Sequence, residues 1–333
     1  MPLIWVIRMD SIVELRNVTK IFTNTQGIIK RKKRTVYALH DVNLSIGEKE
    51  ILGLIGESGS GKTTLGLAVL KLLDLEGGEI LFRGKDILNM KKKETFRFRE
   101  KTEMIFQDPY GSLNPVQSVY KIISTPYKVF NKNAKERDVI ERVIDTLEMV
   151  GLNPPEQYLA KYPNQLSGGQ RQRVGIARAI ITNPEFLVAD EPVSMLDVSL
   201  RADVLNILLE LREKLGSSML FISHDIAVTQ YVSDRIAVMH LGQIVEIAES
   251  TELVNNPLHP YTQTLISSIP IPDPERRWDT SEPKVLAGEY VNEGKDECSF
   301  ANKCPFVMDK CRRSRPKMIE KGNKHYVACY LYE

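Results

Sequence analysis

Two short apolar runs dominate the hydrophobic pattern of this chain. ILGLI covers residues 51–55 and is followed by GESGSGKT, and FLVA covers 186–189 and is followed by DEP. Continuous apolar runs of this length are typical of strands that are buried on both faces of a parallel sheet. Residues 127–151 instead repeat apolar positions at i, i+3 and i+4, which predicts amphipathic helix. The pattern therefore predicts an α/β fold with a parallel-sheet core.

The first apolar run leads into a glycine-rich loop. Gly56, Gly61, Lys62 and Thr63 fill the pattern G-x-x-x-x-G-K-[ST], between a predicted strand and a helix that we expect to begin near Lys62. Glycines allow backbone N–H groups to surround a phosphate, and the helix N-terminus adds its positive dipole. A tight turn in another kind of α/β protein is the alternative, but every motif position is filled in the required context. We predict a loop that binds a nucleoside triphosphate, with Lys62 on the β- and γ-phosphates and the Thr63 hydroxyl on Mg²⁺. The predicted binding residues in this loop are Gly56, Ser58, Gly59, Ser60, Gly61, Lys62, Thr63 and Thr64.

The second apolar run ends in two adjacent carboxylates, Asp190 and Glu191. Ligands of open α/β sheets bind outside the carboxyl ends of the strands, which is where these two side chains are expected. An acidic pair after a strand is usually a solvated turn or a helix cap, but the loop upstream changes that interpretation. We predict that Asp190 holds Mg²⁺ through water and that Glu191 orients or deprotonates the attacking water.

A third motif lies between these two. LSGGQRQRVGIARAI, residues 166–180, offers Ser167 as an N-cap, paired glycines, and a helix with arginines on one side. At this stretch the sequence resembles the ATP-binding cassette (ABC) family, whose signature motif is LSGGQ. The resemblance covers about residues 12–247, and the one small departure is Met195, where the family usually has a small residue. The other family motifs that match are Gln107 in IFQDP (the glutamine loop), Asp197 in SMLD (the D-loop), His224 in FISHD (the switch histidine) and Phe22 in TKIFT (the aromatic residue that stacks on adenine).

The resemblance implies a mechanism with two cassettes facing head to tail and ATP between them. The partner is a second ATPase subunit, identical or different. Glu191, His224 and Gln107 are the implied catalytic residues, and Thr63, Gln107 and Asp190 are the implied Mg²⁺ ligands. The residues implied to contact the ATP of the partner are Ser167, Gly168, Gly169, Gln170 and Asp197.

Composition and charge place few limits on the partner. Hydrophobic residues make up 42% of the chain, charged residues 26%, and the formal net charge is +2, which is ordinary for a soluble globular protein. The apolar start MPLIWVIRM is shorter than the ~20 residues of a membrane span and lacks the features of a signal peptide. We therefore expect a protein on the cytoplasmic side that drives a membrane partner. The basic run KRKKR, residues 30–34, is short, and we interpret it as a solvated loop between strands rather than a nucleic-acid surface.

Further resemblances favour one kind of partner. IFQDPYGSLNPVQSV has the form typical of oligopeptide and dipeptide permease ATPases, and NPLHPYTQTLISSIP, residues 256–270, is similar to the C-terminal element of the same group. The implied function is the ATPase subunit of a dipeptide or oligopeptide importer, peripheral at the cytoplasmic face of the cell membrane. It would act with integral-membrane permease subunits and, indirectly, with an extracytoplasmic solute-binding protein. The alternatives are a sugar or nickel importer, an exporter, and a soluble ABC protein of DNA repair or translation.

The predicted organisation has two parts. Residues 10–250 form the cassette, with an antiparallel N-terminal β-subdomain and a helical subdomain at about 108–175 that receives the permease. Residues 251–333 form a small extension, which we call the C-terminal extension. Within it, IPIPDPERRWDTSEP at 269–283 is predicted to be a proline-rich linker.

All four cysteines lie in the C-terminal extension, at Cys298, Cys304, Cys311 and Cys329. A cytoplasmic location argues against structural disulfides. The spacing C-x5-C-x6-C-x17-C lacks the usual zinc knuckles and differs from ferredoxin spacings, so it does not select a metal, and four unrelated buried thiols remain an alternative. The segment CSFANKCPFVMDKC with the terminal HYVACY looks like the cysteine tail of dipeptide-permease ATPases. That resemblance implies a [4Fe–4S] cluster with one thiolate from each cysteine, or zinc as the alternative. The expected cofactors are thus ATP, Mg²⁺ and this cluster.

Overall fold

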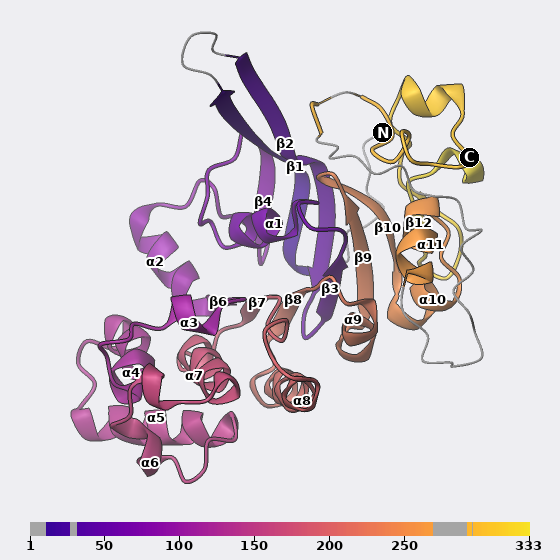
Figure 1. Cartoon of the computed structure of the whole chain (residues 1–333). Helices are drawn as coiled ribbons and strands as arrows, with labels where there is room; N and C mark the ends of the chain where they lie inside the picture. The colour runs from indigo at the N-terminus through magenta and orange to yellow at the C-terminus, as the bar shows by residue number, and fades with distance from the viewer. Residues whose placement is uncertain (1–10, 27–31, 269–291, 295) are drawn as a thin grey trace, which may run out of the picture.

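The computed structural model describes residues 11–26, 32–268, 292–294 and 296–333. Within these residues the strands form two sheets (Figure 1). The smaller sheet is antiparallel, with strand order β2-β1-β4-β5. Its strands are β1 (Ser11–Gln26), β2 (Lys32–Gly47), β4 (Gly77–Phe82) and β5 (Lys85–Asp86).

The larger sheet carries the predicted parallel core. Its order is β11-β12-β10-β9-β3-β8-β7-β6, and the neighbours from β9 to β6 run parallel. The predicted α/β fold, with a parallel core and an antiparallel N-terminal sheet, is confirmed. The strands are β3 (Ile51–Ile55), β6 (Thr102–Ile105), β7 (Phe186–Asp190), β8 (Ser218–Ile222), β9 (Arg235–His240), β10 (Gln243–Glu249), β11 (Ile319–Glu320) and β12 (Tyr326–Val327).

The apolar runs of the sequence became the most deeply buried strands. Every residue of β3, β7 and β8 is buried, because helices or the smaller sheet cover both faces of the parallel core. Burying a leucine or isoleucine side chain fully stabilises the folded state by about 1.5–3 kcal/mol. The motif residues that follow β3 and β7 are therefore attached to firmly packed strands.

The helices fall into two spatial groups. Figure 1 shows α4 to α7 gathered on the side of the molecule away from β9 and β10, whereas α10 and α11 lie beside those two strands. The stretch 127–151, predicted to be helical, contains the end of α4 and the whole of α5, with a break that begins at Asn131. No helix of the described part of the chain is long and apolar enough to cross a membrane. The helices are α1 (Lys62–Val69), α2 (Lys92–Lys101), α3 (Pro109–Ser112), α4 (Val119–Phe130), α5 (Glu136–Met149), α6 (Glu156–Leu159), α7 (Gly168–Ile180), α8 (Val198–Leu215), α9 (Ile226–Val232), α10 (Ser250–Asn255) and α11 (Pro260–Ser267), with short 3₁₀ turns at Pro163–Gln165, Asp309–Arg312 and Tyr330–Tyr332.

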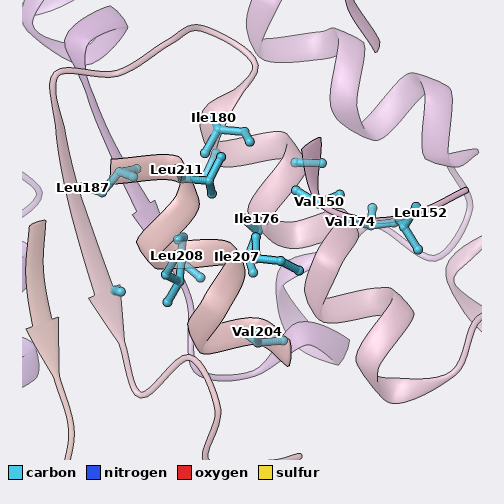
Figure 2. Packing of buried hydrophobic residues seen from close by; sticks show 14 of the residues in the cluster. Val150, Leu152, Val174, Ile176, Ile180, Leu187, Val204, Ile207, Leu208 and Leu211 are labelled. Atoms are coloured by element: carbon cyan, nitrogen blue, oxygen red, sulfur yellow. The ribbon is translucent and has the colours of Figure 1, made fainter. Parts of the chain in front are cut away.

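One continuous apolar cluster ties the helical group to the sheet (Figure 2). Ile176 of α7, Leu208 of α8 and Leu187 of β7 belong to it, and all three side chains are fully buried. The helix that begins at the LSGGQ motif therefore shares one apolar core with the strand that leads into the acidic pair.

The C-terminal extension packs at the β10 end of the large sheet. β12 adds to β10 with Glu246 opposite Val327, and Tyr261 and Phe300 share an apolar cluster with Val238 and Val245 of β9 and β10. Two sequence predictions fall outside the described residues: the linker at 269–283 and the first two residues of the basic run. The last three residues of that run, 32–34, belong to β2 rather than to a loop, because they pair with residues 24–26 of β1.

Candidate active site

Four loops meet at one edge of the large sheet. The parallel neighbours β3, β8, β7 and β6 end at this edge. The glycine-rich loop follows β3, Glu191 follows β7, His224 follows β8, and Gln107 follows β6. The carboxyl edge of an open parallel sheet is where ligands bind, so the topology gathers residues that are far apart in the sequence.

The glycine-rich loop wraps around the ammonium group of Lys62. Lys62 Nζ donates to the carbonyl oxygens of Gly56 and Glu57, at 2.7 and 2.9 Å. Gly61 caps α1 with φ +106°, and a Cβ there would lie 2.3 Å from the carbonyl oxygen of Ala38, so only glycine fits. Burial lowers the pKa of Lys62, against the opposing effect of nearby carboxylates. A buried cation at a helix N-terminus suits the phosphates of a nucleotide.

An oxygen-rich position lies beside this loop. The Thr63 hydroxyl donates to Asp190 Oδ1 at 3.3 Å. Burial raises the pKa of Asp190, and the hydrogen bond from Thr63 opposes that rise. Hydroxyl and carboxylate oxygens are the ligands that Mg²⁺ takes in sites shared with phosphates. The residues present therefore fit ATP with Mg²⁺.

Glu191 lies at the centre of the predicted catalytic group. Gln107 Nε2 lies 2.9 Å from Glu191 Oε2, and His224 Nδ1 lies 3.0 Å from Glu191 Oε1. The Glu191 backbone has φ +46°, in the left-handed region, and its N–H donates to the carbonyl of Ile222 at 2.9 Å. A non-glycine residue held in this conformation costs about 1–3 kcal/mol and is found mostly at functional sites. The strand-end turn thus holds a carboxylate between two polar side chains.

These groups surround a cavity of about 610 Å³. Ten of the predicted site residues line it: Phe22, Ser58, Gly59, Gly61, Lys62, Thr63, Thr64, Gln107, Glu191 and His224. Five lining residues were missed: Val36, Tyr37, Ala38, Leu241 and Asn292. No motif could have revealed these five, because they come from β2, the turn after β9 and the C-terminal extension, which only the folded chain brings together.

The remaining predicted residues lie outside the lining of this cavity. Gly56 and Ser60 belong to the loop, and Asp190 lies behind Thr63. Ser167 is exposed and caps α7, with its hydroxyl accepting from Gln170 N–H at 3.3 Å. The signature residues Ser167, Gly168, Gly169 and Gln170 and the D-loop residue Asp197 do not line the cavity of their own chain.

The predicted metal site in the C-terminal extension is contradicted. Among the described residues, no group of three or more His, Cys, Asp or Glu side chains could hold a metal ion. The prediction of a [4Fe–4S] cluster on Cys298, Cys304, Cys311 and Cys329, and zinc as its alternative, is therefore wrong. The four cysteines line a small apolar cavity together with Phe300 and other residues. Burial raises the pKa of Cys298 to about 12 and also raises the pKa values of Cys304 and Cys329. Metals are bound by thiolates, whereas protonated buried thiols behave as small hydrophobic groups.

Two protein-family models match the chain. The model described as ABC transporter matches residues 39–194, and the model described as oligopeptide/dipeptide transporter, C-terminal region, matches residues 245–311. The second match begins in β10 and covers three of the four cysteines.

Curated relatives align with 79–97% of the chain. A putative oligopeptide transport ATP-binding protein, YkfD of Bacillus subtilis, is 46% identical over 90% of this chain and 91% of its own length. The oligopeptide transport ATP-binding protein AppF of the same organism is 42% identical over 97% of this chain and 98% of its own. OppF of Streptococcus mutans, described in the same words, is 48% identical over 79% of this chain and 83% of its own length.

Solved structures share the fold of about three quarters of this chain. The ATP-binding cassette MJ0796, in a dimeric post-hydrolysis state bound to ADP and Pi, matches with a TM-score of 0.62 and 31% identity over 72% of this chain and 98% of its own. CbiO1 of Clostridium perfringens, part of the ABC transporter complex cbiONQ, matches with a TM-score of 0.63 and 27% identity. The match covers 74% of this chain and 92% of CbiO1. The cassette fold inferred from the resemblance is confirmed.

Proposed function

This chain belongs to the ABC transporter family, and we propose that it is the ATP-hydrolysing subunit of an importer for oligopeptides or dipeptides. One observation carries the proposal: relatives described as oligopeptide transport ATP-binding proteins align with 79–97% of the chain at 42–48% identity. The match of the transporter C-terminal region to residues 245–311 supports the peptide group within the family. The division into a cassette at 10–250 and a C-terminal extension at 251–333 is part of this proposal.

Hydrolysis follows from the residues that line the cavity. Lys62 and the loop N–H groups bind the β- and γ-phosphates, and Mg²⁺, when bound near Thr63 and Asp190, neutralises charge that develops on them. Glu191 accepts a proton from the attacking water, while Gln107 and His224 hold its carboxylate in place. The water oxygen bonds to the γ-phosphorus as the bond to the β-phosphate oxygen breaks, giving ADP and phosphate. Phe22 lines the same cavity with about half of its surface exposed, and it stacks on adenine.

A second cassette completes the site. Ser167 to Gln170 and Asp197 contact the ATP of the partner chain, which is either a second copy or a related subunit. Their position away from their own cavity and the capped, exposed start of α7 support this arrangement. Sedimentation of Glu191→Gln should show monomer without nucleotide and dimer with ATP. A parent dimer that is independent of nucleotide would contradict the arrangement of two cassettes with ATP between them.

The chain drives membrane-embedded permease subunits from the cytoplasmic face, and an extracytoplasmic solute-binding protein supplies the solute. The helical group around α4 is the proposed receiving surface for the permease. Exposed apolar side chains on and near it support this placement: Phe96, Val116 and Val129 are 42%, 79% and 46% exposed, and the rings of Phe96 and Phe130 lie 4.8 Å apart.

Transport in cells tests the proposal. In cells that lack their own copy of this gene, the parent should restore uptake of labelled dipeptides and oligopeptides, and Lys62→Ala should not. Uptake of nickel and of a labelled sugar is measured in the same cells. Restoration of either in place of peptide uptake would refute the peptide assignment. ATP hydrolysis without any effect on uptake, together with co-purification with ribosomes or DNA, would favour a soluble ABC protein instead.

A further inference from the structure

The C-terminal extension touches the glycine-rich loop directly. The N–H of Glu57, the second residue of that loop, donates to the hydroxyl oxygen of Tyr261 at 2.8 Å. Tyr261 lies in α11 and is fully buried, with its ring 4.4 Å from that of His240 and 5.4 Å from that of Phe300. Burial raises the pKa of Tyr261, so its hydroxyl stays protonated at neutral pH. A rigidly packed side chain of the C-terminal extension therefore holds one end of the loop.

A second contact reaches the same loop residue. Lys303 Nζ lies 3.8 Å from Glu57 Oε2, and the Lys303 side chain is only 14% exposed. Glu57 is thus held through its backbone by α11 and through its carboxylate by the segment that follows Phe300. Because Lys62 donates to the carbonyls of Gly56 and Glu57, these contacts anchor the backbone that seats the phosphate-binding lysine.

The C-terminal extension also forms part of the wall of the cavity. The Tyr37 N–H donates to the Asn292 carbonyl at 2.8 Å, and Asn292 Nδ2 donates to the Leu241 carbonyl at 2.9 Å. Asn292 Oδ1 accepts from the N–H of Gly294 at 2.9 Å. Gly294 has φ +83°, and a Cβ there would lie 2.2 Å from the Tyr37 ring. The chain therefore lies closely against Tyr37, and all the polar atoms of the Asn292 side chain take part in holding it.

The contacts at Glu57 and the contacts at Asn292 are joined through the turn after β9. The Gly242 N–H donates to the Ser60 carbonyl at 2.8 Å, and the His40 N–H donates to the Gly242 carbonyl at 2.9 Å. Asn292 holds Leu241, the residue before Gly242. The loop, β2 and the turn after β9 are therefore linked to one another and, through Glu57 and Asn292, to the C-terminal extension.

We propose that the C-terminal extension positions the nucleotide site of its own chain, with Tyr261 fixing the loop at Glu57 and Asn292 fixing the wall at Tyr37 and Leu241. Both are positioning residues that act before ATP arrives. Holding the loop in its binding conformation removes part of the ordering cost of binding, which raises affinity. The proposal rests on the proposed function, since it assumes that the cavity binds ATP.

Matched substitutions separate positioning from stability. Tyr261→Phe removes only the hydroxyl that Glu57 uses. Its control is Tyr332→Phe, because the Tyr332 hydroxyl donates to the Leu258 carbonyl at 2.8 Å, inside the C-terminal extension. Asn292→Ala has a similar control in Asn302→Ala, since Asn302 Oδ1 accepts from Arg312 at 3.0 Å within the C-terminal extension.

The measurement is calorimetric titration of each purified full-length variant with ATP and Mg²⁺, combined with steady-state hydrolysis. Losing one hydrogen bond that preorganises the site should weaken the Kd for ATP by about two- to tenfold. We expect a change of this size for Tyr261→Phe, which loses one bond and should keep kcat at saturating ATP unchanged. We expect a change of at least this size for Asn292→Ala, which loses the side-chain bonds to Leu241 and Gly294. The two controls should keep the parent Kd even where their melting temperatures fall.

Hydrogen exchange gives a reading that a purely structural role would not move. The Glu57 amide should exchange faster in Tyr261→Phe than in the parent and in Tyr332→Phe, without nucleotide. A parent Kd in both Tyr261→Phe and Asn292→Ala would overturn the proposal, as would equal weakening in test and control variants. A parent protein that binds no ATP at all would refute the proposed function itself, so the two failures are distinct.

Discussion

Replacing Glu191 by glutamine removes the proton acceptor while keeping the shape of the side chain. The carboxylate lies 2.9 Å from Gln107 Nε2 and 3.0 Å from His224 Nδ1. Glutamine can occupy the same volume, but it offers one acceptor oxygen in place of two, and its amide does not take a proton from water. The loop and Lys62 are untouched, so nucleotide binding should persist.

The expected loss lies in the chemical step. General-base catalysis contributes about 10²- to 10⁴-fold, which corresponds to about 3–5 kcal/mol of barrier at ~1.4 kcal/mol per tenfold change in rate. We therefore expect kcat for ATP hydrolysis to fall by that factor in Glu191→Gln, with a Kd for ATP close to that of the parent. Single-turnover hydrolysis of γ-labelled ATP measures the chemical step, and calorimetry measures the Kd.

Glu185→Gln is the matched control. Glu185 directly precedes β7, the strand whose other end leads to Glu191, and it pairs with Arg83 and Lys101 at the surface. Exposed ion pairs contribute about 1 kcal/mol or less, so this variant should hydrolyse ATP at the parent rate. A Glu191→Gln rate within threefold of the parent would refute the role of Glu191. A loss of affinity that parallels the loss of rate would mean that Glu191 acts in binding instead.

Three further predictions concern affinity, stability and pH. Lys62→Ala should weaken ATP binding about 10- to 100-fold, because it removes a charged phosphate contact. An ATP titration that gives the parent affinity would contradict this prediction. Glu246→Gln should lower the free energy of unfolding by about 1–3 kcal/mol, because the buried carboxylate accepts from the N–H groups of Leu258 and His259 and pairs with His325 Nε2 at 2.6 Å. Thermal melting measures this loss, and Glu249→Gln on the exposed end of the same strand should melt like the parent. Burial raises the pKa of Glu103 to about 7 from 4.5, so the folded state holds this proton more tightly than the unfolded chain. The resulting stability is fully present below pH 4.5 and is lost as pH rises through 7; urea unfolding at pH 5 and pH 7.5 should therefore show a smaller pH difference in Glu103→Gln than in the parent, and an equal difference would contradict it.

The sequence by itself determined the parallel core and most of one side of the cavity. The runs that became β3 and β7 are apolar throughout because both of their faces are buried, and burial on both faces is visible without a structure. Gly56, Gly61, Lys62 and Thr63 lie within a single turn, so the chemistry of phosphate binding constrains adjacent positions and leaves a readable motif. Where a stretch was only amphipathic, as at 127–151, the pattern predicted helix but missed the break after α4.

Only the tertiary structure decided the other wall of the cavity and the state of the cysteines. Tyr37, Leu241 and Asn292 meet because β2, the turn after β9 and the C-terminal extension pack together, and such contacts leave no local periodicity in the chain. The bond between Glu57 and Tyr261 joins residues 204 positions apart. The resemblance of the cysteine tail to dipeptide-permease ATPases implied a metal cluster, but the protonation of a thiol depends on its burial and neighbours, and burial raises the pKa of Cys298 to about 12. Chemistry confined to one turn can be predicted from sequence, whereas chemistry set by burial and by distant partners requires the fold.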